Sequence, residues 1–398
     1  MIKISTLQVY NEPTTLEHIK ALDFNRTATS TGETEAVNYI EKDLSDNNIK
    51  TEVEHFEWTG PLRILMRTSY VVIFSYFLLY RLFLVIIIYF VIKYMFESFR
   101  RVSLIRKEES KNIFTKISAK NLRPNRPLVI FSAHYDSMSA NLPYKVQVVV
   151  FFIYRMIVIF YGLMILVFAT VFILDYFFEI PFKNFMILLI TITSLAGVFI
   201  SIPILYLVSI EKSSSGSVDN ASGVAILIEL AKLINENPLA NIDVLFIWTG
   251  AEEWGLKGSK KFCKSHFKAL DQTFDLDKSF NINIDMVGSY IGLLDKSGFI
   301  IKRKMNRELN DILEATANQL HIPLERYKKI IKPQSDYKSF KKYAKSVNSK
   351  FQVSCFHSSR DSKYIHSVRD TPDRCSVEFL NGCLNICHQT LRSIDLRE

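Results

Sequence analysis

The stretch "PLVIFSAHYDSMSANLPYKVQVVVFFIYRMIVIFYG", residues 127–162, changes character along its length. It opens with Leu128–Ser132, a short apolar run of the kind found in a strand that is buried on both faces. His134 and Asp136 follow, and side chains two positions apart lie on the same side of an extended chain. From Met156 onward the stretch is apolar and uncharged. A strand end with metal-ligand residues is therefore followed directly by a segment with the composition of a membrane helix.

Three apolar blocks interrupt the sequence. Met156–Leu174 holds 19 residues without a charge and Asn184–Ile210 holds 27, whereas a helix needs about 20 apolar residues to cross a hydrocarbon core of about 30 Å. Thr68–Phe96 is as apolar but contains Arg81 and Lys93. A buried core helix is the alternative for such runs, but a run of 27 uncharged residues is long for one. We therefore expect an integral membrane protein.

The overall composition sets further bounds. The chain has 398 residues, enough for one core of about 200–300 residues and additional elements. Its opening, "MIKISTLQVYNEPTTLEHIK", has no apolar segment that would predict a signal peptide. Five cysteines without metal-ligand spacing favour a reducing compartment over a disulfide framework. The net charge of +9 comes largely from basic residues beside the apolar blocks and along Lys302–Lys350, so we expect contact with anionic lipid and no nucleic-acid partner.

The rest of the chain alternates strands and helices. Helices are expected at Glu33–Asp46, Gly223–Asn235, Leu256–Phe267, Met305–His321 and Val377–Ile394. Strands are expected at Thr51–Trp58, Ile113–Lys116, Leu128–Ser132, Asn241–Gly250, Ser279–Met286 and Phe351–Phe356. This order predicts an α/β fold with a mostly parallel central sheet and helices on both faces.

Carboxylate and imidazole side chains recur at the ends of these strands and in loops, where α/β sheets place ligands. They are His134 with Asp136, Asp219, Glu252 with Glu253, Asp285, and His366 with Asp370 and Asp373. Taken alone, each has an ordinary structural explanation, such as a hydrogen-bonded histidine or a solvated helix start. Each acidic group, however, follows a run too apolar to be a surface, and a buried carboxylate is costly unless it is paired or binds a metal. A pair of divalent cations would balance such a cluster.

The ordered motifs H-x-D, D-N-A-S-G, G-A-E-E-x-G, N-x-D-M-x-G, S-D and H-x3-D-T-P-D resemble those of peptidase family M28. These are co-catalytic dizinc peptidases typified by bacterial aminopeptidases and related to glutamate carboxypeptidases. The resemblance covers about Leu16–Trp58 and Asn112–Ser393, apart from the apolar blocks, and residues 26–44 resemble the family's opening helix. It implies a zinc exopeptidase fold, interrupted here by transmembrane helical hairpins.

The resemblance also implies roles for individual residues. Asp219 would bridge two Zn²⁺ ions, His134 and Asp285 would complete one site, and Glu253 and His366 would complete the other. Glu252 would stay off the metals as general base. Carboxylate and imidazole ligands suit Zn²⁺, and two ions about 3.5–4 Å apart can activate a shared water.

Three further residues are assigned through the same motifs. Asp136 is expected to act in catalysis by accepting the second ring N–H of the ligand His134. Asp336 matches the family's S-D-H motif near the substrate, and Tyr337 stands where the family usually has histidine. Both are predicted to contact substrate. The resemblance further implies a cis peptide bond between Asp219 and Asn220.

The apolar blocks must leave and return to the same side of the membrane. His134 and Asp219 are 85 positions apart, yet both would have to reach the same metal, so an even number of crossings is required. We expect peptidase segments at 1–62, 101–144 and 211–398, and membrane hairpins at 63–100 and 145–210. About 50 Å of helix, at about 1.5 Å per residue, allows residues 63–100 barely two crossings, so one interfacial helix is the alternative there.

Basic residues indicate the orientation. Those on the peptidase side of the blocks are Arg63, Arg67, Arg100, Arg101, Arg106, Lys107, Lys145 and Lys212. The far turns contain only Arg81 and Lys183, together with Asp175 and Glu179. The positive-inside bias therefore places the catalytic domain on the cytoplasmic face.

The leading hypothesis is a membrane-anchored, zinc-dependent exopeptidase that hydrolyses peptide substrates, most simply as an aminopeptidase. A glutaminyl-cyclase-like enzyme with a single zinc is a second reading of the motifs. A non-catalytic receptor or scaffold homologue is a third, although such proteins typically lose metal ligands. Zinc content distinguishes them, because the three hypotheses predict two, one and no ions per chain.

Overall fold

The computed structural model describes residues 14–59, 62–80, 88–89, 107–178, 183–208, 213–297, 303–306, 308–329 and 334–398. The chain divides into two compact units. The sheet unit comprises Met1–Trp58, Glu109–Ser139 and Lys212–Glu398, and the apolar unit comprises Thr59–Glu108 and Ala140–Glu211. The division falls close to the segment boundaries expected from the sequence, while the functions of those segments stay predictions.

The sheet unit is built on one nine-stranded sheet of order β1-β2-β4-β3-β5-β9-β6-β7, with β8 paired to β6. The strands are β1 Glu52–Trp58, β2 Glu108–Ile117, β3 Leu128–His134, β4 Asp243–Thr249, β5 Phe280–Ile284, β6 Gly292–Ser297, β7 Arg303–Lys304, β8 Glu325–Lys329 and β9 Gln352–Phe356. The central strands β4, β3, β5 and β9 are parallel to one another. The pairs β2–β4, β6–β9 and β6–β7 are antiparallel, so the sheet is mixed, with the expected parallel arrangement confined mainly to its centre.

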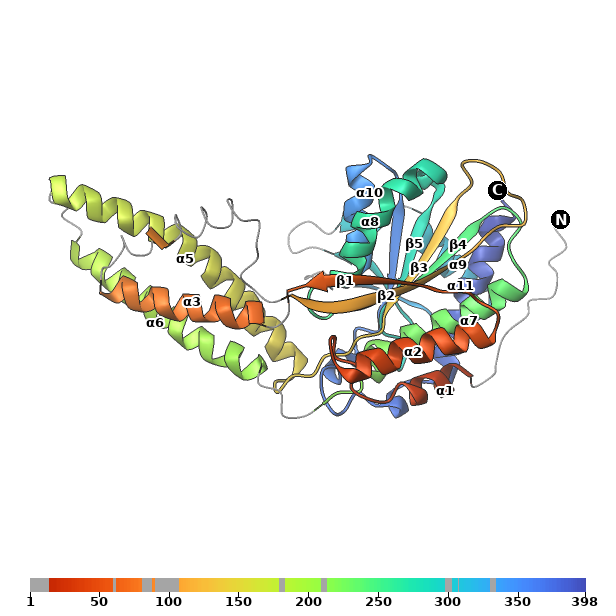
Figure 1. The fold of residues 1–398 in the computed structure, drawn as a ribbon, viewed down its shortest axis with the longest axis horizontal. Coiled ribbons are helices and arrows are strands. Elements are labelled where there is room, and N and C mark those ends of the chain that lie inside the picture. The colour runs from red at the N-terminus through yellow and green to blue at the C-terminus, as the bar shows by residue number, and fades with distance from the viewer. Residues whose placement is uncertain are drawn as a thin grey trace. The chain divides into compact units, whose positions relative to one another are not determined.

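Helices cover both faces of this sheet (Figure 1). They are α1 Thr14–Ala21, α2 Thr31–Asp46, α7 Ser222–Glu236, α8 Lys257–Thr273, α9 Leu309–Gln319, α10 Tyr337–Ser346 and α11 Val377–Asp395. On one face, α8 and α10 bury Phe262 and Phe340 against alternate strand residues such as Ile130 and Ile247. On the other face, Trp248 donates a hydrogen bond to a carbonyl of α7. Because side chains alternate along a strand, the continuous apolar runs of β3 and β4 supply both cores.

The expected elements appear with some displaced ends and additions. The helix expected at Met305–His321 begins at Leu309, because Met305 extends the pairing with β6 and donates its backbone N–H to the carbonyl of Asp295. Outside the apolar blocks, five of the described α-helices and strands were not expected: α1, β6, β7, β8 and α10. The sequence of β8, "ERYKK", carries no apolar alternation, so its strand conformation comes from pairing with β6 rather than from a local pattern.

The apolar unit contains α3 Leu62–Leu79, α5 Tyr144–Phe178 and α6 Lys183–Val208, and α6 contacts both other helices. α5 and α6 therefore form two packed helices in the region expected as the second hairpin. Among the described residues, one helix, Asn184–Tyr206, is long and apolar enough to cross a membrane. The turn residue Arg81 and most of the second leg of the first hairpin lie outside the described residues.

Candidate metal centre

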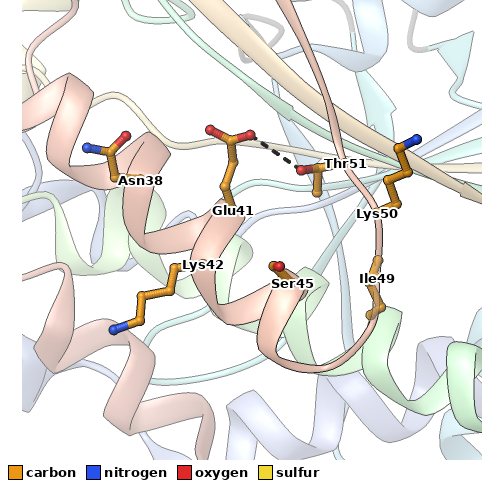
Figure 2. A pocket seen from close by; sticks show the side chains of 7 residues that line it. All are labelled: Asn38, Glu41, Lys42, Ser45, Ile49, Lys50 and Thr51. Carbon is orange, nitrogen blue, oxygen red and sulfur yellow. Dashed lines mark hydrogen bonds between the residues drawn. The ribbon is translucent and has the colours of Figure 1, made fainter.

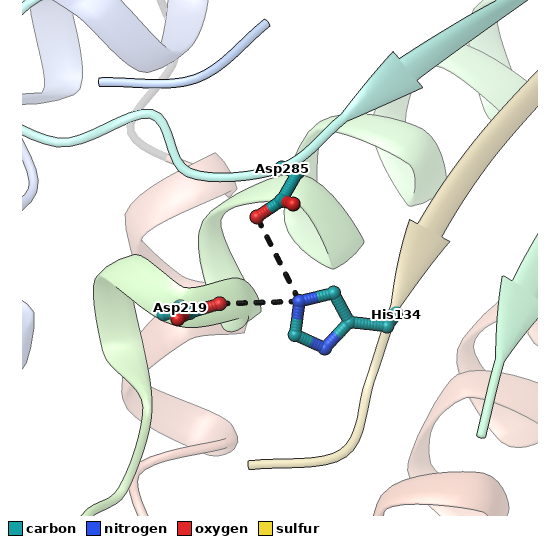
Figure 3. Close-up of side chains that lie close together, drawn as sticks. All are labelled: His134, Asp219 and Asp285. Atoms are coloured by element: carbon teal, nitrogen blue, oxygen red, sulfur yellow. Dashed lines mark ion pairs between the residues drawn. The ribbon is translucent and has the colours of Figure 1, made fainter. Parts of the chain in front are cut away.

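Three side chains meet where the parallel strands end (Figure 3). His134 is the last residue of β3, Asp285 directly follows β5, and Asp219 lies in the turn Ser217–Ala221 before α7. The Nε2 atom of His134 lies 3.1 Å from Oδ1 of Asp219 and 3.7 Å from Oδ1 of Asp285. Parallel strands place their carboxyl ends at one edge, so residues far apart in sequence converge here.

A second group shares Asp219. The Nε2 atom of His366 lies 3.5 Å from Oδ2 of Asp219 and 3.1 Å from Oε2 of Glu253. In each group of three, the candidate ligand atoms all lie within 4.8 Å of one another. Asp219 faces the two groups with its two different carboxylate oxygens. All five predicted metal ligands are thus brought together, although their binding of metal stays a prediction.

This donor set fits divalent cations. The side chains are almost entirely buried, and carboxylates outnumber imidazoles among them. Oε1 of Glu252 and Oε1 of Glu253 are buried and have no hydrogen-bond partner. Buried anionic oxygens without partners are costly, and imidazole with carboxylate is a common zinc ligand set. A cation between these groups would satisfy both requirements.

The pKa values of these side chains depend strongly on the neighbouring charges. Burial alone would lower the pKa of His366, but Glu253 and Asp219 outweigh it and raise the pKa to about 10. Burial likewise opposes the charged form of His134, whose pKa the surrounding carboxylates raise well above its usual value. Burial raises the pKa of Glu252 far above that of a solvated carboxyl, and the neighbouring carboxylates of Asp336 and Glu253 add to this effect. The surrounding carboxylates therefore favour the charged form of both imidazoles.

The turn that carries Asp219 is held by hydrogen bonds from two directions. The carboxylate of Asp370 accepts hydrogen bonds from the backbone N–H groups of Val218, at 2.6 Å, and Asp219, at 3.3 Å. The peptide bond between Asp219 and Asn220 is cis, as the resemblance implied. The side chain of Asn220 donates to the carbonyl of Ile284 and accepts from the N–H of Met286, at 2.9 and 3.0 Å. Asn220 therefore fixes the turn against the segment that carries Asp285.

Left-handed backbone conformations occur at and beside the candidate ligands. Ala251, directly before Glu252, has φ of 49°, and Met286, directly after Asp285, has φ of 76°. His366 itself has φ of 57°. Such conformations are uncommon for residues with a side chain and cluster at functional sites, where the surrounding structure enforces them.

The carboxylate of Asp136 lies closer to the backbone of Glu252 and Glu253 than to the ring of His134. Its carboxylate accepts hydrogen bonds from the backbone N–H groups of Glu252, at 3.0 Å, and Glu253, at 3.2 Å. Oδ1 of Asp136 lies 3.6 Å from Nδ1 of His134, whereas the backbone carbonyl of Asp136 lies 3.0 Å from that nitrogen. Asp136 thus orients His134 through its carbonyl and the two glutamates through its side chain.

The two predicted substrate-binding residues are buried. Asp336 is fully buried and accepts a hydrogen bond from Thr249, the last residue of β4, while its Oδ1 has no partner. Burial raises the pKa of Asp336 to about 6. Tyr337 is 1% exposed and belongs to the core beneath α8 and α10, so its side chain fills space there. Substrate contact by either residue stays a prediction.

Supporting residues were not identified from the sequence. Asp361 accepts hydrogen bonds from the backbone and hydroxyl of Ser289 and contacts Gly288, where a Cβ would lie 2.5 Å from its Oδ2. Arg26 lies fully buried in the loop between α1 and α2. Neither position has a local pattern that separates it from an ordinary solvated charge.

A hollow of about 410 Å³ lies beside the C-terminal half of α2 (Figure 2). It is lined by Asn38, Glu41, Lys42, Ser45, Ile49, Lys50 and Thr51. Thr51 donates a hydrogen bond of 3.4 Å to Glu41, and most lining side chains are exposed. None of these residues belongs to the candidate metal centre.

Comparisons with known proteins relate this chain to a peptidase family. Residues 201–391 match the model of peptidase family M28. A segment of 77 residues is 38% identical to aminopeptidase YwaD of Bacillus subtilis (strain 168), but it covers only 19% of this chain and 16% of that relative.

Several solved structures are similar across most of the chain. An aminopeptidase from Aneurinibacillus sp. strain AM-1 has a TM-score of 0.56 and 14% identity, covering 96% of this chain and 93% of that one. BSAP, a zinc aminopeptidase from Bacillus subtilis, gives 0.56 and 12%, covering 97% and 96%. A glutaminyl cyclase from Fimbriiglobus ruber gives the same TM-score, identity and coverage as BSAP. At such low identities the likeness establishes the fold alone.

Proposed function

This chain carries a peptidase family M28 domain over residues 201–391, and on that premise we propose that it is a zinc-dependent exopeptidase, most simply an aminopeptidase. One observation carries the proposal. Two groups of buried imidazole and carboxylate ligands share Asp219, and the buried Oε1 of Glu252, the residue before the candidate ligand Glu253, has no partner. This arrangement supports two Zn²⁺ ions held by His134, Asp219, Glu253, Asp285 and His366.

Bound zinc would supply Lewis acidity, which lowers the pKa of water and polarises a scissile carbonyl. Glu252 would take a proton from the attacking water and return it to the leaving amine. Asp136 would keep Glu252 and Glu253 in place through their backbone N–H groups.

Asp336 and Tyr337 would shape the substrate side of the site from within the core. The carboxylate of the buried Asp336 contributes to raising the pKa of Glu252. Tyr337 is the next residue along the chain and the first residue of α10. We expect Asp336→Asn to change KM or kcat for peptides while leaving zinc content unchanged. An unchanged kcat and KM would remove Asp336 from the proposed site.

The first experiment is the zinc content of the purified protein, combined with assays on free-amine and blocked-amine peptides. Two ions per chain, with hydrolysis of free-amine peptides only, is the result expected of an aminopeptidase. One ion per chain would favour the glutaminyl-cyclase-like alternative, whose fold this chain shares equally well. Absence of zinc and of activity would favour a non-catalytic homologue and contradict the proposal.

We further propose that the apolar unit anchors the enzyme in a lipid bilayer, with the catalytic domain on the cytoplasmic side. Ser139 and Ser214 lie on either side of the second apolar insertion, and the N–H of Ser214 donates a 2.7 Å hydrogen bond to Oγ of Ser139. The chain therefore leaves and re-enters the sheet unit at one place. This supports an even number of crossings, and the basic flanking residues support the orientation.

Cysteine labelling with a membrane-impermeant reagent tests the topology. All five native cysteines are buried, so they can be kept. We expect Phe178→Cys, at the end of α5, and Lys345→Cys, on an exposed position of α10, to be labelled from opposite sides of the membrane. Labelling of both positions from the same side would contradict the proposed topology.

A further inference from the structure

Among the described residues, Arg26 is the only fully buried lysine or arginine. It contacts both of the chain segments that flank the second apolar insertion, residues 140–211. Its Nε donates a hydrogen bond to the carbonyl of Tyr135 at 2.8 Å, and its Nη2 donates to the carbonyl of Gly216 at 2.9 Å. Its Nη1 donates to the carbonyls of Leu22 and Ser215. A buried charge is costly unless its donors are satisfied, and here backbone carbonyls from three separate segments satisfy them.

Two of these segments carry candidate metal ligands. Tyr135 directly follows His134, and Gly216 directly precedes the turn Ser217–Ala221 that contains Asp219. The backbone of Arg26 adds two contacts on the same side. Its N–H donates to Oγ of Ser137 at 2.9 Å, and its carbonyl accepts from the N–H of Ser137 at 3.3 Å. Arg26 therefore holds the strand end and the turn in one fixed relation.

The guanidinium of Arg26 is closely packed against the backbone at Gly216. Gly216 has φ of 62°, and a Cβ built there would lie 2.4 Å from the carbonyl oxygen of Asp219 and 3.3 Å from Nη2 of Arg26. Burial lowers the pKa of Arg26 to about 10, and the carboxylates of Asp370, Asp136 and Asp219 act in the opposite direction. The side chain is therefore charged at neutral pH and also offsets the negative charge of the centre.

We propose that Arg26 is a positioning residue for the metal centre. It clamps the strand end that carries His134 to the turn that carries Asp219, across the point where residues 140–211 are inserted. A long insertion separates these two ligands in sequence, and closing it costs chain entropy that local contacts must offset. The proposal rests on the proposed zinc function, because metal affinity is the property that the clamp would set.

The test compares Arg26→Met with wild type by competing Zn²⁺ against a chromophoric chelator, well below the unfolding temperature. We expect the affinity of the Arg26→Met protein to fall by about 10–100-fold, the range typical of residues that orient metal ligands. Arg26→Lys, which keeps the charge but has fewer and less rigid donors, should recover part of this loss. Zinc affinity is a readout that a residue needed only for stability would not change.

Arg326→Met is the matched control. Arg326 joins Asp295, Asp311 and Glu314 at β8, remote in sequence from every candidate ligand. The Arg326→Met substitution should lower the melting temperature while leaving zinc affinity unchanged. If Arg26→Met behaves in the same way, with unchanged zinc affinity, the positioning role is refuted.

Two further outcomes are separable. Wild-type protein that binds no zinc would overturn the proposed function and this inference together, whereas two ions in both proteins with equal affinity would overturn only the inference. If Arg26→Met does not fold, Ser137→Ala removes the Oγ that accepts the hydrogen bond from the N–H of Arg26, and it should weaken zinc binding several-fold. Unchanged affinity in the Ser137→Ala protein would then reject the clamp.

Discussion

The two units of this chain differ in how far they bury their apolar side chains. In the sheet unit, Phe246 is fully buried between the rings of Phe131 and Trp248. In the apolar unit, Phe199 and Leu195 of α6 are 68% and 48% exposed. A water-soluble protein rarely exposes many large apolar residues on adjoining helices. Under the membrane anchoring proposed above, this difference has a simple physical reason, because the sheet unit would face water and α6 would face lipid.

The largest expected effect tests whether the chemistry belongs to the sheet unit alone. Glu252→Gln should lower kcat by about 10²–10⁴-fold, because the amide cannot accept the proton of water. Zinc content should remain at two per chain, since Glu252 is not a proposed ligand. Glu253→Gln is the matched variant, and we expect it to lose zinc affinity. Near-wild-type turnover of the Glu252→Gln protein would contradict its role as general base.

The second prediction tests the difference in solvent directly. Leu195 lies at the middle of Asn184–Tyr206, and Leu195→Lys should oppose membrane insertion of this helix by about 2.5–3.5 kcal/mol. Leu122, which is 73% exposed in the sheet unit, is the control, because Leu122→Lys should change stability by no more than about 0.5 kcal/mol. The measurement is the membrane-bound fraction after carbonate extraction. Equal behaviour of both variants would show that α6 faces water.

The sequence was most informative where a pattern is local. The apolar runs of β3 and β4 predicted buried strands, and residues that follow such runs lie together in the candidate metal centre. By contrast, the strand order, the antiparallel edges and β8 depend on pairing between distant segments, which no local period records.

The contacts of the centre's supporting residues could not be predicted for a related reason. Asp136 was expected to bond to the ring of His134, but its carboxylate accepts from the backbone of Glu252 and Glu253. Arg26 looks like any charged residue in its loop until the fold brings carbonyls from three segments around it. Residue type limits the chemistry that a position can perform, while tertiary packing selects the partner.

The smallest expected effect concerns charges inside the sheet unit, where burial is tolerated only with partners. Glu229 of α7 receives contacts from His18 of α1 at 2.7 Å and Lys232 at 3.0 Å, and Lys232 also contacts Asp43 of α2 at 2.6 Å. Burial alone would raise the pKa of Glu229, but the hydrogen bonds from His18 and Lys232 outweigh it and lower the pKa to about 2. The network joins three helices through one ionised carboxylate.

A lowered pKa means that the folded protein binds this proton more weakly than the unfolded chain does. The stabilisation is therefore complete above the usual pKa of 4.5 and is lost as the pH falls towards 2. After allowance for solvent screening, we expect it to be on the order of 1–2 kcal/mol. The melting temperatures of wild type and Glu229→Gln in detergent should thus differ most near about pH 6, and the difference should shrink progressively as the pH falls from about 4.5 to about 2. The titration of carboxyls outside this network cancels in the difference between the two proteins. A difference independent of pH would show that the Glu229 carboxylate is not stabilised by its partners.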